Sequence, residues 1–124
     1  MTAPSHVRVL PSEGNITAPR VKYCASFLCR LRGLTFRPPL GLDEGLLLVF
    51  ARDSRVDSSI HMLGVRFDLA VFWIDSELRI VDKVMAAAGK PAFFPKSPAR
   101  YVLELSARHF NDFEIGQQVR FQNA

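Results

Sequence analysis

The sequence predicts an α+β fold that is mainly β: a compact antiparallel sheet curled into a partly closed barrel, with two short helices. The length of 124 residues fits one domain with one core. Apolar runs of strand length, about seven or eight of them, alternate with turn clusters. Most of these runs are joined as hairpins and no β-α-β rhythm is visible, which favours an antiparallel arrangement.

The first predicted hairpin opens the domain. Residues 1–6 are expected to form a disordered tail, and residues 7–124 a single globular domain. The apolar run 7–10 leads into the turn cluster 11–15, and a second strand follows over 16–23.

A short helix is expected next. Ser26 is a suitable N-cap, apolar residues follow at helical spacing, and Gly33 is a natural terminator. Residues 46–50 are apolar at every position, which predicts a central strand buried on both faces.

The middle of the chain contains the clearest hairpin. Residues 58–62 can form a strand that Gly64 interrupts, and residues 69–74 and 78–84 flank a turn at 75–77. The proline-rich segment 86–99 reads as a long loop.

The last third of the chain returns to the sheet. Phe93 and Phe94 of the long loop are expected to plug the open end of the barrel, and the alternative is a docking surface for another protein or a membrane. Residues 101–105 alternate as a strand does, Ser106 can cap a second short helix, and residues 119–121 predict a final strand.

Composition excludes several classes of protein. Hydrophobic residues make up 48% and charged residues 23%, the balance of an ordinary soluble domain. No apolar run approaches the roughly 20 residues of a membrane span. The first residues show no signal-peptide pattern, so we expect a cytoplasmic protein.

Neither cysteine chemistry nor a cofactor is predicted. An offset of five puts Cys24 and Cys29 on different faces of a helix, so we expect two unpaired, buried thiols. Two cysteines are too few for a structural zinc or iron–sulfur site. His61 and His109 with a nearby acid match no metal-ligand spacing, and there is no hydrolase or phosphate-loop motif.

Three landmarks occur in a fixed order along the chain. The first is Arg-Leu-Arg-Gly-Leu-Thr-Phe-Arg at 30–37, with Asp-Glu-Gly-Leu-Leu-Leu at 43–48. The second is Ile-His-Met-Leu-Gly-Val-Arg-Phe at 60–67, running into Phe-Trp-Ile-Asp at 72–75. The third is Ala-Arg-Tyr-Val-Leu-Glu-Leu at 99–105, followed by Ile-Gly at 115–116.

Together these landmarks resemble the prokaryotic family called domain of unknown function 192, over roughly residues 7–122. The resemblance implies a small, mostly β domain with two short helices, and it implies no activity. Relatives carry Pro-Ile-Asp where this chain has Asp-Leu-Ala at 68–70. The usual carboxylate is therefore replaced by Ala70, and Asp68 is a candidate replacement on the same strand face.

The candidate ligand-binding residues surround the second and third landmarks: His61, Arg66, Asp68, Glu104 and Arg37. A histidine, carboxylates and guanidiniums could bind an anionic small molecule or carry out acid–base work. The alternative is structural, with a satisfied His61 and with Arg66 paired to Asp68 or Glu104.

Three functions therefore remain open, in decreasing order of preference. The first is a noncatalytic module, a monomer, that binds a small ligand or a protein partner in a crevice near His61 and Arg66. The second is a small enzyme that uses His61 as acid or base. The third is a nucleic-acid binder that uses the basic residues Lys22, Arg30, Arg32 and Arg37; the scattered arginines make it the weakest.

Overall fold

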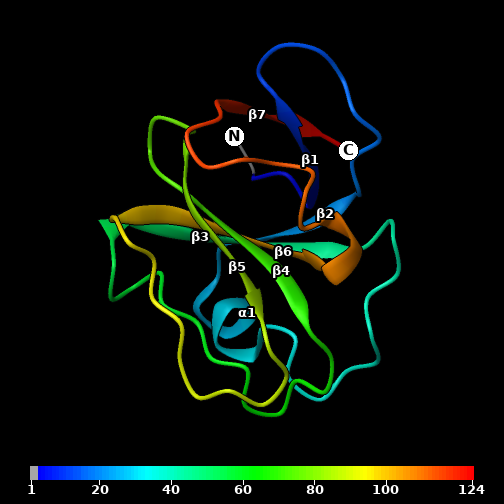
Figure 1. Ribbon diagram of the computed structural model, residues 1–124, viewed down its shortest axis with the longest axis vertical. Helices are drawn as coiled ribbons and strands as arrows, with labels where there is room; N and C mark the ends of the chain where they lie inside the picture. The colour runs from blue at the N-terminus through cyan, green and yellow to red at the C-terminus, as the bar shows by residue number, and fades with distance from the viewer. Residues whose placement is uncertain (1–2) are drawn as a thin grey trace.

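The computed structural model describes residues 3–124 and contains a single curled sheet of seven strands (Figure 1). The strand order is β5-β4-β6-β3-β2-β1-β7. The strands are β1 (His6–Pro11), β2 (Val21–Cys24), β3 (Gly45–Ser54), β4 (Leu69–Ile74), β5 (Ile80–Ala86), β6 (Ala99–Ser106) and β7 (Val119–Asn123). The helical elements are α1 (Phe27–Arg32) and the 3₁₀ turn η1 (Ala107–His109). The predicted mainly β, half-closed fold is confirmed.

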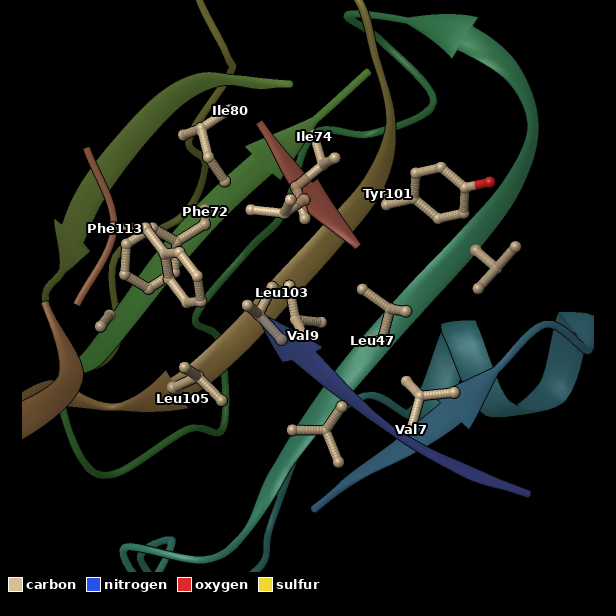
Figure 2. Close-up of a cluster of buried hydrophobic side chains, with 14 residues drawn as sticks. Val7, Val9, Leu47, Phe72, Ile74, Ile80, Tyr101, Leu103, Leu105 and Phe113 are labelled. Carbon is tan, nitrogen blue, oxygen red and sulfur yellow. The ribbon is translucent and has the colours of Figure 1, made fainter. Parts of the chain in front are cut away.

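The sheet curls because β1 and β7 fold back over one of its faces (Figure 1). Side chains of β1, including Val7 and Val9, lie over Leu47, Leu103 and Phe72 of the central strands (Figure 2). We call this set of buried side chains the inner cluster. It excludes water from one face of the central strands, which is the main source of stability for a small β domain.

The opposite face of the sheet is covered by α1 and by the long loops between β3 and β4 and between β5 and β6. Its buried residues, which include Leu46, Leu48, Val71 and Trp73, form the outer cluster. Met62 of the first loop is fully buried in it. Figure 1 shows α1 on the side of the sheet away from β1 and β7.

Strand β4 shows why a run that is apolar at every position forms a central strand. It pairs antiparallel with β5 on one side and with β6 on the other, and all six of its residues are buried. Phe72 points into the inner cluster, and Val71 and Trp73 into the outer cluster. The hairpin predicted at this place is confirmed.

The expectation of an antiparallel sheet is wrong for one pair of strands. Strands β2 and β3 are parallel, with Lys22 opposite Leu46, and α1 lies in the connection between them. The connection also contains an irregular stretch over 33–44, so the sequence pattern showed no regular alternation of strands and helices.

The prediction of two unpaired thiols is also wrong, because Cys24 and Cys29 form a disulfide. The helical offset does not apply to them. Cys24 is the last residue of β2, and only Cys29 belongs to α1. The chain turns between them, which brings their Cα atoms to 5.5 Å, a normal separation for a bridged pair.

Three smaller predictions differ from the structure. The second helix is only the 3₁₀ turn η1. Residues 58–62 form no strand, and only Ile60 pairs there, through a single bridge to Phe93. Residues 1–2 of the predicted tail lie outside the described residues, and His6 already belongs to β1.

Candidate functional site

The clearest pocket of the described chain lies on the outer face of the sheet and has a volume of about 460 Å³. We call it the outer pocket. Its floor includes Leu48, Leu69 and Glu104 of three neighbouring strands. One wall is α1 with the turn that follows it, and the other is the loop segment 57–65.

Glu104 is the buried polar group of this floor. In β6 it lies opposite Leu46 of β3 and Val71 of β4, so its side chain shares the outer face with theirs. The residue is only 5% exposed. Among the described residues, no donor lies within hydrogen-bonding distance of its carboxyl oxygens, and no cation lies within 4.0 Å.

Burial without a partner changes the acidity of this carboxyl. Desolvation penalises the charged form and raises the pKa of Glu104 from its ordinary 4.5 to about 7. The other buried polar side chains differ in this respect. Asp82 accepts the backbone N–H groups of Lys83 and Lys96, and Ser58 donates to the carbonyl oxygen of Ser54.

His61 lies on the rim of the same pocket, in the loop wall, and is exposed. Its neighbours hold the loop in place. Ile60 exchanges two backbone hydrogen bonds with Phe93, and Met62 N–H donates to the carbonyl oxygen of Lys90. Trp73 Nε1 donates to the Ser58 carbonyl oxygen at 2.8 Å, which fastens the start of the wall to β4.

The other three predicted site residues lie elsewhere. Arg66 and Arg37 border a separate shallow depression, and Arg37 Nη2 pairs with Glu44 Oε2 at 3.1 Å. Asp68 precedes β4 and accepts the Ala88 N–H at 2.9 Å. Of the five predicted residues, only His61 and Glu104 therefore line the outer pocket.

The hypothesis that Asp68 substitutes for the carboxylate missing at Ala70 depends on both residues lying in one strand. The strand begins only at Leu69, so the two-residue period does not extend to Asp68. Ala70 is fully buried in the inner cluster, whereas Asp68 is exposed. The two positions do not share an environment.

The basic residues divide between two sites. Lys22 and Arg37 border a second depression beyond the turn that follows α1, and Arg32 lines both this depression and the outer pocket. Arg30 instead faces the outer pocket, where its Nη1 donates to the carbonyl oxygens of Ala25 and Val49 at 2.7 and 2.9 Å. Its guanidinium also lies 5.2 Å from the centre of the Phe50 ring.

Sequence reasoning missed the role of the apolar residues of α1. Their helical spacing predicted the helix itself, and no residue of this helix is buried. Phe27 and Leu31 are 68% and 64% exposed and line the outer pocket. The sequence did contain a signal that some of these side chains are exposed. The helix has only six residues, three of them large and apolar, and so short a helix cannot bury all three.

His109 shows a structural arrangement. Its Nδ1 lies 2.6 Å from Asp112 Oδ2, and its Nε2 lies 2.8 Å from the Leu42 carbonyl oxygen. This histidine therefore joins η1 to the loop before β3. Over residues 3–124 no group of three or more His, Cys, Asp or Glu side chains is placed to hold a metal ion. The same residues include no helix that is long and apolar enough to cross a membrane.

A half-closed, seven-stranded sheet with a pocket on its outer face defines a small β-rich domain. Residues 8–121 match the model of the family described as Uncharacterized ACR, DUF192. The chain belongs to this family, as the three landmarks indicated.

The relatives are archaeal proteins called UPF0127. Those of Thermococcus kodakarensis and Thermococcus gammatolerans are each 32% identical over 75% of this chain. The matched region spans only 57% and 59% of their own lengths.

Two solved structures have the same fold. A protein of Sinorhizobium meliloti, provisionally described as a transcription regulator, has a TM-score of 0.80 with 21% identity. The match covers 96% of this chain and 94% of that one. A protein of unknown function from Novosphingobium aromaticivorans has a TM-score of 0.78 with 19% identity, over 93% and 83% of the two chains. At these identities the likeness shows the fold alone.

Proposed function

We propose that this chain is a noncatalytic binding module that holds a small ligand in the outer pocket. The observation that carries the proposal is the Glu104 carboxyl, which lies buried on the pocket floor without a partner among the described residues. Burying a polar group costs free energy unless a partner compensates for it. A ligand that enters the pocket can supply that partner.

The walls of the pocket support the same function. Binding sites for small molecules are mostly apolar clefts of roughly 300–1,000 Å³ with a few convergent polar groups. The outer pocket has a volume of about 460 Å³. The exposed side chains of Phe27 and Leu31 stand at its rim, where a ligand would cover them.

The enzymatic alternative has less support. His61 lines the pocket, but among the described residues His109 is the histidine with a ring nitrogen within 4.0 Å of a carboxylate. His61 therefore has no acidic partner to orient its ring, as a catalytic base normally has. A carboxyl with a pKa near 7, such as that of Glu104, suits proton transfer, yet no second polar side chain contacts it.

The nucleic-acid alternative is supported by the depression that Lys22, Arg32 and Arg37 border. The provisional description of the Sinorhizobium protein belongs to that protein and fits the same alternative. We rank it below ligand binding, because Arg37 is already paired with Glu44 and Arg30 faces the other pocket. Affinity for mixed DNA that falls steeply with salt would favour it.

Two further parts of the proposal concern the state of the protein. We still predict that the protein is a monomer, and sedimentation would measure its oligomeric state. A cytoplasmic location also stays a prediction. The Cys24–Cys29 disulfide weighs against it, because disulfides persist mainly in oxidising compartments.

A fragment screen by ¹H–¹⁵N NMR tests the binding function. We expect hits that shift the amide signals of Ile60, His61 and Glu104 together. Leu31→Ser removes part of the rim and should weaken these hits. Leu28→Ser is the matched control, because Leu28 is also largely exposed on the same helix, at 75% against 64% for Leu31, but borders the other depression.

The screen can also contradict the proposal. If no fragment shifts signals in the outer pocket, or if both variants weaken every hit equally, the pocket is not the binding site. Fragments that shift only the amide signals of Lys22, Arg32 and Arg37 would place the binding site in the depression that these three residues border.

A further inference from the structure

The chemistry of the pocket floor restricts which ligand can bind there, provided that the proposed binding function is correct. Glu104 is 5% exposed and lies between Leu46 and Val71 in the middle of the sheet. Its surroundings on the floor are apolar, with Leu48 and Leu69 beside it in the pocket lining. A carboxylate in such a place has lost most of its hydration and accepts no hydrogen bond from the described residues, and its oxygens stay accessible from the pocket.

Three kinds of ligand head group would meet this carboxyl differently. An anionic head would be repelled by the ionised form. A neutral hydroxyl could donate one hydrogen bond, which is charge-assisted by the carboxylate alone. An ammonium would donate a hydrogen bond in which both partners are charged, and it alone would neutralise the buried charge.

The other charged groups that face the pocket do not change this order of preference among ligand head groups. From α1, the Arg30 guanidinium is held by two hydrogen bonds from its Nη1 to backbone carbonyl oxygens and lies over the Phe50 ring, and it forms no ion pair with Glu104. Arg32 is exposed at the rim, so solvent and salt screen its charge. From the loop wall, His61 is exposed, and Asp57 lies 3.9 Å from Arg52. Glu104 is the ionisable group at depth.

The size of the pocket indicates the rest of the ligand. Its volume of about 460 Å³ is several times that of a cavity that holds a benzene molecule, about 150 Å³. An apolar body the size of a ring with a short chain would fit between the sheet and α1. It would also cover the exposed faces of Phe27 and Leu31.

We infer that the ligand of the outer pocket is a monocation, a primary ammonium on an apolar body of ring size, whose charged head pairs with the Glu104 carboxylate. The apolar walls supply most of the contact area, and the buried acid selects the charge of the head group. The inference goes beyond the proposed function because it names the class of ligand.

Three probes of nearly equal shape test the charge preference: 2-phenylethylamine, 2-phenylethanol and phenylacetate. NMR titrations of the whole chain at pH 8 should show the amine binding at least about tenfold tighter than the alcohol, with phenylacetate weakest. Glu104→Gln should remove the preference for the amine and leave the binding of the alcohol nearly unchanged.

The pH dependence supplies a second measurement. The preference for the amine should shrink at pH 5.5, where Glu104 becomes protonated because burial raises its pKa to about 7. Histidine side chains titrate in the same range, so His61→Asn is the control and should keep the pH dependence.

A third measurement uses the unmodified protein, in case Glu104→Gln does not fold. Saturation with the amine should lower the pKa of Glu104, followed through its side-chain carboxyl ¹³C signal, and saturation with the alcohol should lower it much less.

The possible failures can be told apart. If the amine and the alcohol bind the pocket equally, or phenylacetate binds tightest, the cation inference is wrong and the binding function stands. If none of the probes and no fragment of the wider screen shifts the pocket signals, the proposed function itself is wrong.

Discussion

The disulfide between Cys24 and Cys29 joins the last residue of β2 to the third residue of α1. It is a short link, with five residues of sequence separation. No residue of α1 is buried, so the helix has little core packing of its own. The Ser26 cap and the Arg30 hydrogen bonds to Ala25 and Val49 are its other attachments. The bond therefore helps to position one wall of the outer pocket.

Reduction of the disulfide should loosen α1 more than the sheet. Closing so short a loop is worth about 2 kcal/mol of unfolding free energy in the chain-entropy account. Denaturant unfolding with and without reductant should show a loss of that size. Hydrogen exchange should quicken mainly over 27–33. The Cys24→Ala/Cys29→Ala variant is the control and should not respond to reductant; an unchanged midpoint on reduction of the natural chain would contradict the prediction.

Ionisation of Glu104 should make stability depend on pH. The pKa is about 7 in the folded chain and 4.5 ordinarily, so the folded state binds the proton more tightly. Stability should therefore fall as the pH rises from 4.5 to 7 and level off above 7. Each pKa unit corresponds to about 1.4 kcal/mol, which puts the total fall at roughly 3 kcal/mol.

Glu104→Gln should remove this fall, so the variant should gain stability relative to the natural chain between pH 5 and 8. Urea unfolding across that range is the measurement. Glu13→Gln makes the same change of charge in the exposed turn after β1 and should leave the pH profile as it is. A profile that Glu104→Gln leaves unchanged would show that Glu104 is not the buried, unpaired acid described above.

Trp73→Phe should destabilise the protein and free the loop wall of the pocket. The substitution removes the 2.8 Å hydrogen bond from Nε1 to the Ser58 carbonyl oxygen and opens space in the outer cluster. We expect a loss of about 2–4 kcal/mol. Circular dichroism must follow unfolding, because Trp73 is the only tryptophan. Faster exchange of the amides over 57–62 should accompany the loss; exchange confined to other segments would argue against this anchor.

Gly64→Ala should cost more stability than Gly89→Ala. Both glycines have a φ of +77°, so both substitutions carry the same backbone strain. A Cβ at Gly64 would lie 2.8 Å from Thr35 Cγ2, whereas one at Gly89 would meet nothing within 4 Å. We expect a difference of about 1–2 kcal/mol from this overpacking. Equal losses in thermal unfolding would mean that Thr35 moves aside freely.

Local patterns in the sequence were sufficient for much of the fold. The run 69–74 is apolar at every position and is followed by a turn, which predicted the β4–β5 hairpin. Ser26 and Gly33 bounded α1 correctly, with the Ser26 side chain accepting the Cys29 N–H. These features depend on residues close together in the chain, and that is why a single sequence reveals them.

The predicted site was only partly correct for the opposite reason. His61, Arg66 and Asp68 are neighbours in sequence, but their loop turns at Gly64 and directs them to different depressions. The same limit applies to Cys24 and Cys29, whose pairing depends on the turn between strand and helix.

The sequence by itself determined most of the strands, the helix cap and the family, since each depends on short-range patterns. It also placed Glu104 on one face of β6 through simple alternation. Only the tertiary structure decided that this face is covered, because the cover comes from α1 and from the loop at 57–65, far away in the chain. That covering removes water from one carboxyl and so turns an ordinary strand residue into the polar centre of a pocket.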